Sequence, residues 1–248
     1  MGKTKIEWCN YTFNPWVGCA KVSPGCAHCY AETWAKRTGF TMWGDNPRRI
    51  TSDNNWSKLQ LWNDLQNSEM PRQTVFVASL ADVFEDRPEI LEPRQRLFAE
   101  LERLDSLIYL ILTKRPENIL DMIPNRWRYE IPRHIWMGVS IESADYLTRL
   151  DSLGSIPASR FVSIEPMLGP VDLKQSRCAW AISWIICGGE SGPRARPMQL
   201  DWASALADQC KNSHIPFFMK QLGGHPDKRN DIKTFPPTMQ IREFPDWD

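Results

Sequence analysis

Three cysteines near the N-terminus have the residue type and spacing of a metal-binding loop. Cys19, Cys26 and Cys29 follow the pattern C-x6-C-x2-C within residues 16–30, and no fourth cysteine follows nearby. The Pro-Gly pair directly before Cys26 favours a turn, so one short loop can direct all three sulfur atoms at one centre. We therefore interpret residues 16–30 as a metal loop.

The kind of metal is open at this level. Three thiolates on a four-iron cluster leave one iron free for another ligand, whereas ferredoxin-type ligation uses four cysteines. Structural zinc is the main alternative, because either Cys9 or His28 could complete a tetrahedral ligand set. Free buried cysteines are a third possibility. The spacing favours an iron–sulfur cluster with one open iron.

The remaining cysteines indicate a reducing environment. The chain has seven cysteines, an odd number, and Cys178, Cys187 and Cys210 fall in what look like core strands or helices. Free cysteine behaves there as a small hydrophobe. The polar start of the chain has no secretory hydrophobic region. Both features favour a cytoplasmic protein without disulfides.

Composition favours one folded domain spanning residues 1–248. Hydrophobic residues make up 42% of the chain and charged residues 24%, which is ordinary globular usage. The formal net charge is zero, so no overall field attracts nucleic acid or anionic lipid. No apolar run approaches the ~20 residues needed to cross a bilayer. Most of the twelve tryptophans are expected in buried packing.

The chain alternates short apolar runs with helical patterns. The segment leading into Cys19 counts as the first predicted strand. Six more strands are predicted at 74–79, 107–113, 135–140, 161–164, 184–187 and 217–219. Helices are predicted at 30–36, 57–65, 89–104, after Pro116, and at 143–153 and 200–210, with a loop over 40–55.

These strands lack strict polar alternation, which indicates that both of their faces are covered. Right-handed crossovers through the intervening helices then give a parallel sheet. We predict an α/β fold whose sheet closes into a partial parallel (β/α) barrel of about six to seven strands. A doubly wound open sheet is the alternative.

Polar residues follow most of the predicted strands at the point where each strand ends. In parallel barrels this carboxyl edge carries the site, because the loops after the strands converge there. Four charged residues at this edge are the catalytic candidates: Lys114, Glu165, Glu190 and Lys220. The alternative is a buried ion-pair network that only holds the barrel rim, since structural networks also gather charges in such places.

The cysteine loop resembles the cluster loop of radical S-adenosylmethionine (SAM) enzymes, although the usual first gap is three residues rather than six. The resemblance implies a [4Fe-4S] cluster on Cys19, Cys26 and Cys29, reductive cleavage of SAM to a 5′-deoxyadenosyl radical, and a partial barrel of that type. It also implies an electron donor such as flavodoxin or ferredoxin.

The same resemblance suggests which residues bind SAM. His28 occupies the position that the family places beside the adenine, with Tyr30 close to it in the chain. Ser79 and Asp82 stand where relatives have a Gly-Gly-Glu-like turn for the amino group. Ser140 and Glu142 resemble the polar residues that contact ribose and carboxylate.

Nearly the whole chain resembles a family of phage- and plasmid-associated bacterial proteins with three radical SAM-type cysteines and no assigned function. It is more distantly similar to the lyase that repairs spore thymine photoproducts by hydrogen abstraction from DNA. The matching phrases are residues 14–19, 23–26, 29–32, 112–117, 138–142, 163–166, 188–192, 195–197 and 217–223.

Basic residues near the predicted mouth suggest the class of substrate: Lys114, Arg115, Arg194, Arg196 and Lys220. A basic mouth favours an anionic substrate such as a nucleotide or nucleic acid strand, bound through its phosphates. Solvated surface charge is the simpler explanation. Two functions therefore stand: a radical SAM enzyme that abstracts hydrogen from such a substrate, and a non-catalytic, zinc-stabilised nucleic-acid-binding protein.

Overall fold

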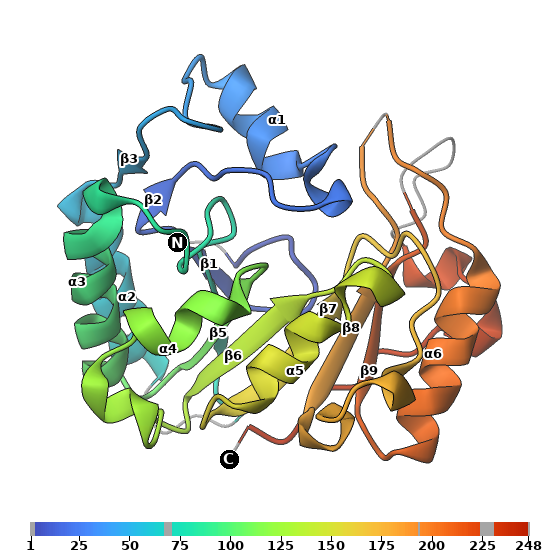
Figure 1. Ribbon diagram of the computed structural model, residues 1–248. Helices are drawn as coiled ribbons and strands as arrows, with labels where there is room; N and C mark the ends of the chain where they lie inside the picture. The colour runs from blue at the N-terminus through green and yellow to red at the C-terminus, as the bar shows by residue number, and fades with distance from the viewer. Residues whose placement is uncertain (1–2, 67–70, 193, 224–230, 248) are drawn as a thin grey trace.

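The computed structural model describes residues 3–66, 71–192, 194–223 and 231–247 (Figure 1). Within them, one sheet contains seven parallel strands in chain order. These strands are β1 (Tyr11–Phe13), β4 (Thr74–Val77), β5 (Ile108–Thr113), β6 (Ile135–Ser140), β7 (Ser159–Ile164), β8 (Trp184–Gly188) and β9 (Phe217–Gln221). Each strand pairs with the next one along the chain, and the sheet curls into a half-barrel. The predicted α/β partial barrel is confirmed, at the upper end of the expected strand number.

Helices cover the outer face of this sheet and one end of it (Figure 1). They are α1 (Tyr30–Arg37), α2 (Asp53–Gln66), α3 (Leu91–Arg103), α4 (Ile119–Met122), α5 (Thr148–Gly154) and α6 (Leu200–Asn212). Helix α1 lies above the carboxyl edge of the sheet, next to an antiparallel pair formed by β2 (Trp16–Val17) and β3 (Arg49–Ile50).

Two details of the sequence prediction are wrong. Residues 40–55 are not a plain loop, because β3 lies within them and α2 already begins at Asp53. An acidic residue in the first turn stabilises the start of a helix, and Asp53 has this place in α2. The polar residues around Asp53 hid this signal in the sequence. The helix expected after Pro116 is a 3₁₀ turn followed by only four α-helical residues.

Alternate residues of the strands enter two different hydrophobic clusters. Val75, Val77, Ile185 and Cys187 pack with the helices. Their neighbours Phe76, Trp184 and Ile186 belong to an aromatic cluster on the other face, which also holds Trp8 and Cys9 and packs against Trp247. Both faces are therefore buried, which explains the continuous apolar runs of the sequence.

The cysteines and tryptophans outside the loop largely behave as expected. Cys187 in β8 and Cys210 in α6 are fully buried, as predicted. Cys178 is only half-buried and precedes a 3₁₀ turn, so its assignment to a core element was wrong. Seven of the tryptophans are buried: Trp8, Trp16, Trp56, Trp62, Trp127, Trp136 and Trp184. None of the helices in the described part of the chain is long and apolar enough to span a membrane.

Candidate functional site

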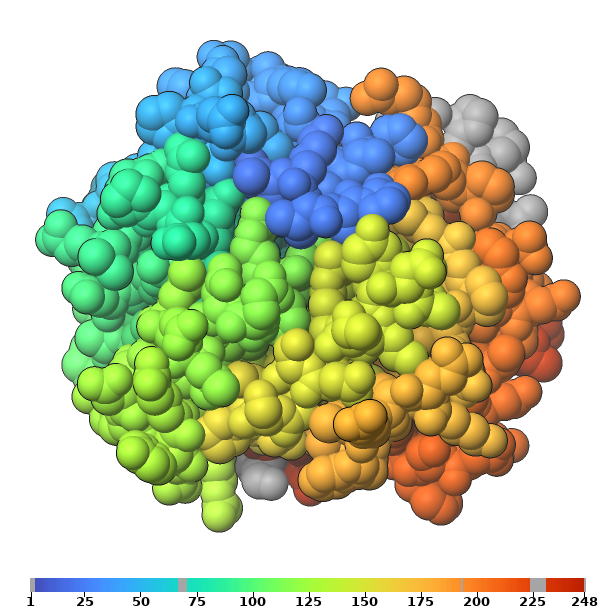
Figure 2. All heavy atoms as spheres, viewed as in Figure 1, coloured from blue at the N-terminus to red at the C-terminus, as the bar shows by residue number. Residues whose placement is uncertain are grey.

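The segment from β2 to α1 carries the three loop cysteines over the carboxyl edge of the sheet. Gly18 has φ +119°, and its N–H donates to the carbonyl of Leu80 at 3.0 Å, which ties the loop to the segment after β4. Cys26 ends a 3₁₀ turn that begins at Pro24, and Cys29 is the N-cap of α1. In the space-filling view, these blue atoms press against the green and yellow residues at the edge of the sheet (Figure 2).

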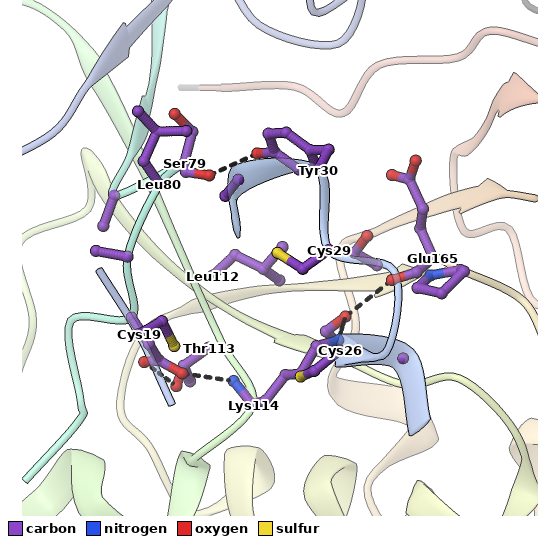
Figure 3. A pocket seen from close by; sticks show the side chains of 18 of the residues that line it. Cys19, Cys26, Cys29, Tyr30, Ser79, Leu80, Leu112, Thr113, Lys114 and Glu165 are labelled. Carbon is purple, nitrogen blue, oxygen red and sulfur yellow. Dashed lines mark hydrogen bonds between the residues drawn. The ribbon is translucent and has the colours of Figure 1, made fainter. Parts of the chain in front are cut away.

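All three cysteines line one cavity of about 430 Å³ (Figure 3). Cys19 lies on one side of it, and Cys26 and Cys29 lie on the other. Most of the residues singled out from the sequence meet there. The wall includes Cys19, Cys26, His28, Cys29, Tyr30, Ser79, Asp82, Lys114, Ser140, Glu165, Glu190 and Lys220. Residues more than 200 positions apart in the chain are thus brought together by the parallel order of the strands.

The loop thiols are free and have polar neighbours. A guanidinium N–H of Arg115 donates to Cys19 Sγ at 3.7 Å, and Ser23 Oγ lies 3.7 Å from Cys26 Sγ. Burial, with a further contribution from the Asp82 carboxylate, raises the pKa of Cys19 to about 12. Burial also raises the pKa of Cys29. Binding of a metal by these thiols must therefore release protons.

The three loop thiols are donors of the kind that an iron–sulfur cluster takes. In the described ranges, no group of three His, Cys, Asp or Glu side chains is placed to hold one metal ion. The thiols instead stand around a cavity, as a cluster whose irons each take one thiolate requires. Of the two candidate fourth zinc ligands, Cys9 belongs to the aromatic cluster with Trp8 and Phe76 and does not line the cavity, whereas His28 lines it.

Asp82 is held by three groups at the end of β5 and directly after it. It accepts hydrogen bonds from Thr113 Oγ1 at 2.7 Å, from the Lys114 amide at 3.2 Å and from Arg115 at 2.8 Å. Arg115 also donates to the carbonyl of Ala20 in the cysteine loop at 2.8 Å. Asp82 therefore orients the arginine that contacts both Cys19 and its neighbour.

Glu142 is fully buried and lies behind the cavity wall rather than in it. It pairs with Lys114 at 2.7 Å and Arg149 at 2.9 Å, and it accepts a hydrogen bond from Ser23 Oγ at 2.6 Å. A Cβ on Gly25 would overlap its carboxylate. These cations and Ser23 hold the pKa of Glu142 below its usual value despite burial. Glu142 thus holds the cysteine loop in place through its hydrogen bond with Ser23.

Glu190 holds the same loop through other residues. Its Oε2 lies 3.0 Å from His28 Nδ1, and Arg196 pairs with its Oε1 at 2.5 Å. Arg196 also donates to the carbonyl of Pro24 at 2.8 Å. Although burial alone would raise it, hydrogen bonds from Arg196 and His28 lower the pKa of Glu190 to about 2. The loop after β8 is thereby tied to the cysteine loop.

The other cavity-lining groups form two smaller sets. Lys220 pairs with Glu165 at 2.5 Å, and Ser140 Oγ lies 2.5 Å from Lys114 Nζ. Tyr30 donates its hydroxyl hydrogen to the carbonyl of Ser79 at 2.6 Å. All four catalytic candidates, Lys114, Glu165, Glu190 and Lys220, thus form ion pairs, as the rim-network alternative expected, and they also face the cavity.

The argument for a basic mouth changes once the ion pairs are known. Lys114, Arg115, Arg196 and Lys220 each pair with a carboxylate. Among the five basic residues considered, Arg194 alone is exposed without an ion pair in the part of the chain that the structure describes. Free positive charge at the mouth is therefore smaller than the sequence suggested.

Several supporting residues escaped the sequence analysis. Arg48 has a fully buried side chain that pairs with Glu85 at 2.7 Å, and the Glu85 carboxylate accepts the Ala20 amide at 2.9 Å. Asn14 holds Ser79 Oγ at 3.0 Å and the Leu80 amide at 2.7 Å. Arg48 lies in a segment rich in Gly, Pro and Asn, where no local pattern indicates a buried arginine. Asn14 directly precedes Pro15-Trp16, in the segment that leads into Cys19.

Comparison with known proteins gives one family and two distant structures. No curated protein matches. One variant of spore photoproduct lyase aligns at 14% identity and a TM-score of 0.45, over 76% of this chain and 58% of that chain. A second variant, with bound AdoMet and a dinucleoside spore photoproduct, aligns at 13% identity and a TM-score of 0.45, over 84% of this chain and 62% of that one. This chain thus spans about three-fifths of those proteins.

A family model covers almost the entire chain. It matches residues 3–242 and is described as "Protein of unknown function (DUF5131)". The match includes the cysteine loop, every strand of the sheet and all of the cavity-lining residues. The chain belongs to this family of proteins of unknown function, DUF5131.

Proposed function

We propose that this protein is a radical SAM enzyme. The observation that carries the proposal is that the three thiols of one short loop line a single cavity at the carboxyl edge of a parallel half-barrel, while the fourth candidate thiol lies elsewhere. Three cysteines on four irons leave one iron open to a cofactor. The cavity, at about 430 Å³, is within the size range of small-molecule sites.

Cys19, Cys26 and Cys29 would hold a [4Fe-4S] cluster. When bound, the cluster and SAM supply one-electron reductive cleavage of SAM and abstraction of hydrogen from a substrate. The chain's own residues set the geometry: Glu142 and Glu190 hold the loop through different residues, and Arg115 provides positive charge beside Cys19. An electron donor such as flavodoxin or ferredoxin remains part of the proposal.

The cavity wall offers complementary groups for SAM. Lys220 and Glu165 present a positive and a negative group side by side, which suits a ligand that carries both an amino group and a carboxylate. Phe76, Leu80 and Leu112 supply apolar wall for a planar base. His28, Tyr30, Ser79, Asp82 and Ser140 line the same cavity and remain proposed cofactor contacts. Glu142 is proposed to act on SAM only through Lys114 and the loop.

The test is SAM cleavage by anaerobically reconstituted protein. With dithionite as reductant, we expect release of 5′-deoxyadenosine from the wild type and none from Cys26→Ala. A matched control is Cys178→Ala, which removes a half-buried thiol outside the cavity and should retain cleavage. Stoichiometric zinc with no iron uptake and no cleavage would contradict the proposal and favour the zinc-stabilised binding protein.

A further inference from the structure

Free positive charge gathers in a second hollow, on the outer side of the cysteine loop. This groove, of about 470 Å³, is lined by Lys21, Ala27, His28, Cys29, Glu32, Thr33, Lys36, Arg37 and Arg194. Four of these side chains are cationic and Glu32 is the one carboxylate among them. In Figure 1 the loop after β8, in orange, rises beside the start of α1.

The ion pairs leave most of this charge available. Lys21 and Lys36 share the Glu32 carboxylate, each at 2.8 Å. Neither Arg37 nor Arg194 forms an ion pair with any described residue, and both are exposed. The groove therefore keeps an excess of three positive charges over its carboxylate, on a chain whose overall net charge is zero. Such local concentration of charge indicates an anionic ligand.

Exposed aromatic side chains lie in α1 and just after it, next to these basic residues. Trp34 is 45% exposed and lies one helical turn before Arg37, so their side chains are neighbours on the helix surface. Phe40 is also 45% exposed, and the guanidinium of Arg49 lies 3.8 Å above its ring. Aromatic rings interleaved with basic side chains form stacking platforms and phosphate contacts for unpaired nucleotides.

The groove lies next to the catalytic cavity proposed above. His28 and Cys29 line both hollows, so they form the wall that separates them. We propose that this surface, from Arg194 and Lys21 across α1 to Phe40, binds single-stranded nucleic acid and leads it to the cavity. The inference rests on the proposed function for what happens in the cavity, but the binding itself requires no turnover.

A single strand fits this surface better than an acidic protein. The exposed rings are unnecessary for charge pairing alone, whereas bases that are not paired in a duplex offer their faces for stacking. Duplex recognition would instead require an element that enters a groove. In this region α1 is a single helix of eight residues with two buried alanines on its inner side, Ala31 and Ala35.

The experiment measures binding of labelled oligothymidylate and oligouridylate by fluorescence anisotropy, on the protein as purified and after iron–sulfur reconstitution. With four phosphate contacts, log K should fall with log salt at a slope of about −3, so affinity should drop about 50-fold between about 50 and 200 mM salt. The double variant Arg37→Glu/Arg194→Glu should bind more weakly and have a slope of about −1.4. Trp34→Ala should lower affinity about tenfold and leave the slope unchanged.

The matched control is a double variant with the same change of charge at the opposite edge of the sheet. Arg133 and Arg177 are exposed, precede β6 and β8, and therefore lie at the opposite edge of the sheet. Arg133→Glu/Arg177→Glu should leave both affinity and slope as in the wild type. Equal effects of the two double variants, or equal affinity for polyglutamate and oligonucleotide, would overturn the inference. A protein that binds the strand but assembles no cluster would refute the proposed function alone.

Discussion

Two sets of three cysteines in this chain have the same chemistry and opposite surroundings. Cys19, Cys26 and Cys29 line a cavity beside Arg115, Ser23 and Lys114. The others, Cys9, Cys187 and Cys210, are buried in hydrophobic clusters. Cys187 Sγ, for example, lies 3.7 Å from the sulfur of Met167.

The loop cysteines are half-buried and the core cysteines are buried, but this difference does not separate their thiol chemistry. Burial raises the pKa of Cys19 and of Cys9 alike, each to about 12. What differs is that the loop thiols face a space that can hold a ligand, whereas the core thiols face other side chains. A cysteine becomes a metal-ligand candidate through the cavity and the polar contacts around it, and the next four changes test that distinction.

The largest effect is expected from removing one loop thiol. Cys29→Ala should abolish assembly of a four-iron cluster, because the remaining two thiols cannot hold it, while the melting temperature of the metal-free protein should stay within a few degrees of the wild type. Iron and acid-labile sulfide analysis after reconstitution provides the measurement. Full cluster content in this variant would remove Cys29 from the ligand set.

A core thiol should show the reverse behaviour. Cys187→Ser places a hydroxyl at a fully buried position in β8 and should cost about 1–3 kcal/mol of the free energy of unfolding. Cluster content should be unchanged. Urea denaturation and iron analysis of the same sample compare the two. A loss of iron without a loss of stability would mean that the core and loop cysteines are not functionally distinct.

The support of the loop by Glu142 can be disturbed without touching a cysteine. In Gly25→Ala the new methyl group would overlap the Glu142 carboxylate, so the loop must shift, at a cost of about 1–3 kcal/mol. We expect slower and less complete iron uptake. Gly169→Ala is the control, since its Cβ would approach Ser143 no closer than 3.2 Å. If both variants take up iron equally, the contact between Gly25 and Glu142 does not position the loop.

The smallest effect is expected at the other support. Glu190→Gln keeps the shape and one hydrogen bond but removes the charge that pairs with Arg196 and His28, at about 1 kcal/mol. The assembled cluster should lose iron faster to a chelator, with little change in melting temperature. A lower melting temperature with unchanged iron retention would instead make Glu190 part of a structural rim.

The sequence was sufficient for the sheet and the loop because both are local signals. The apolar runs at 74–79, 107–113 and 135–140 correspond to β4, β5 and β6 within a few residues, and the Pro-Gly turn before Cys26 is present. Twelve of the thirteen predicted site residues line one cavity: seven predicted from the carboxyl-edge rule, and five from the cysteine loop and the start of α1. Their roles in binding or catalysis remain predictions.

Pairing between distant side chains could not be read from the sequence. Glu142 looks like any other strand-end carboxylate until Lys114, Arg149 and Ser23 are seen around it. In the same way, the sequence allowed Lys220 to be either free charge at the mouth or part of an ion-pair network, and it did not identify Glu165 as the partner. Such partners are fixed by the packing of different strands, which leaves no trace in local spacing.

The central claim is that the loop holds a cluster with one iron open to SAM. Low-temperature EPR of the anaerobically reconstituted and reduced protein, with and without SAM, tests it most directly. We predict a reduced four-iron signal that shifts when SAM is added. A signal that SAM leaves unchanged, or stoichiometric zinc with no iron signal at all, would contradict the claim.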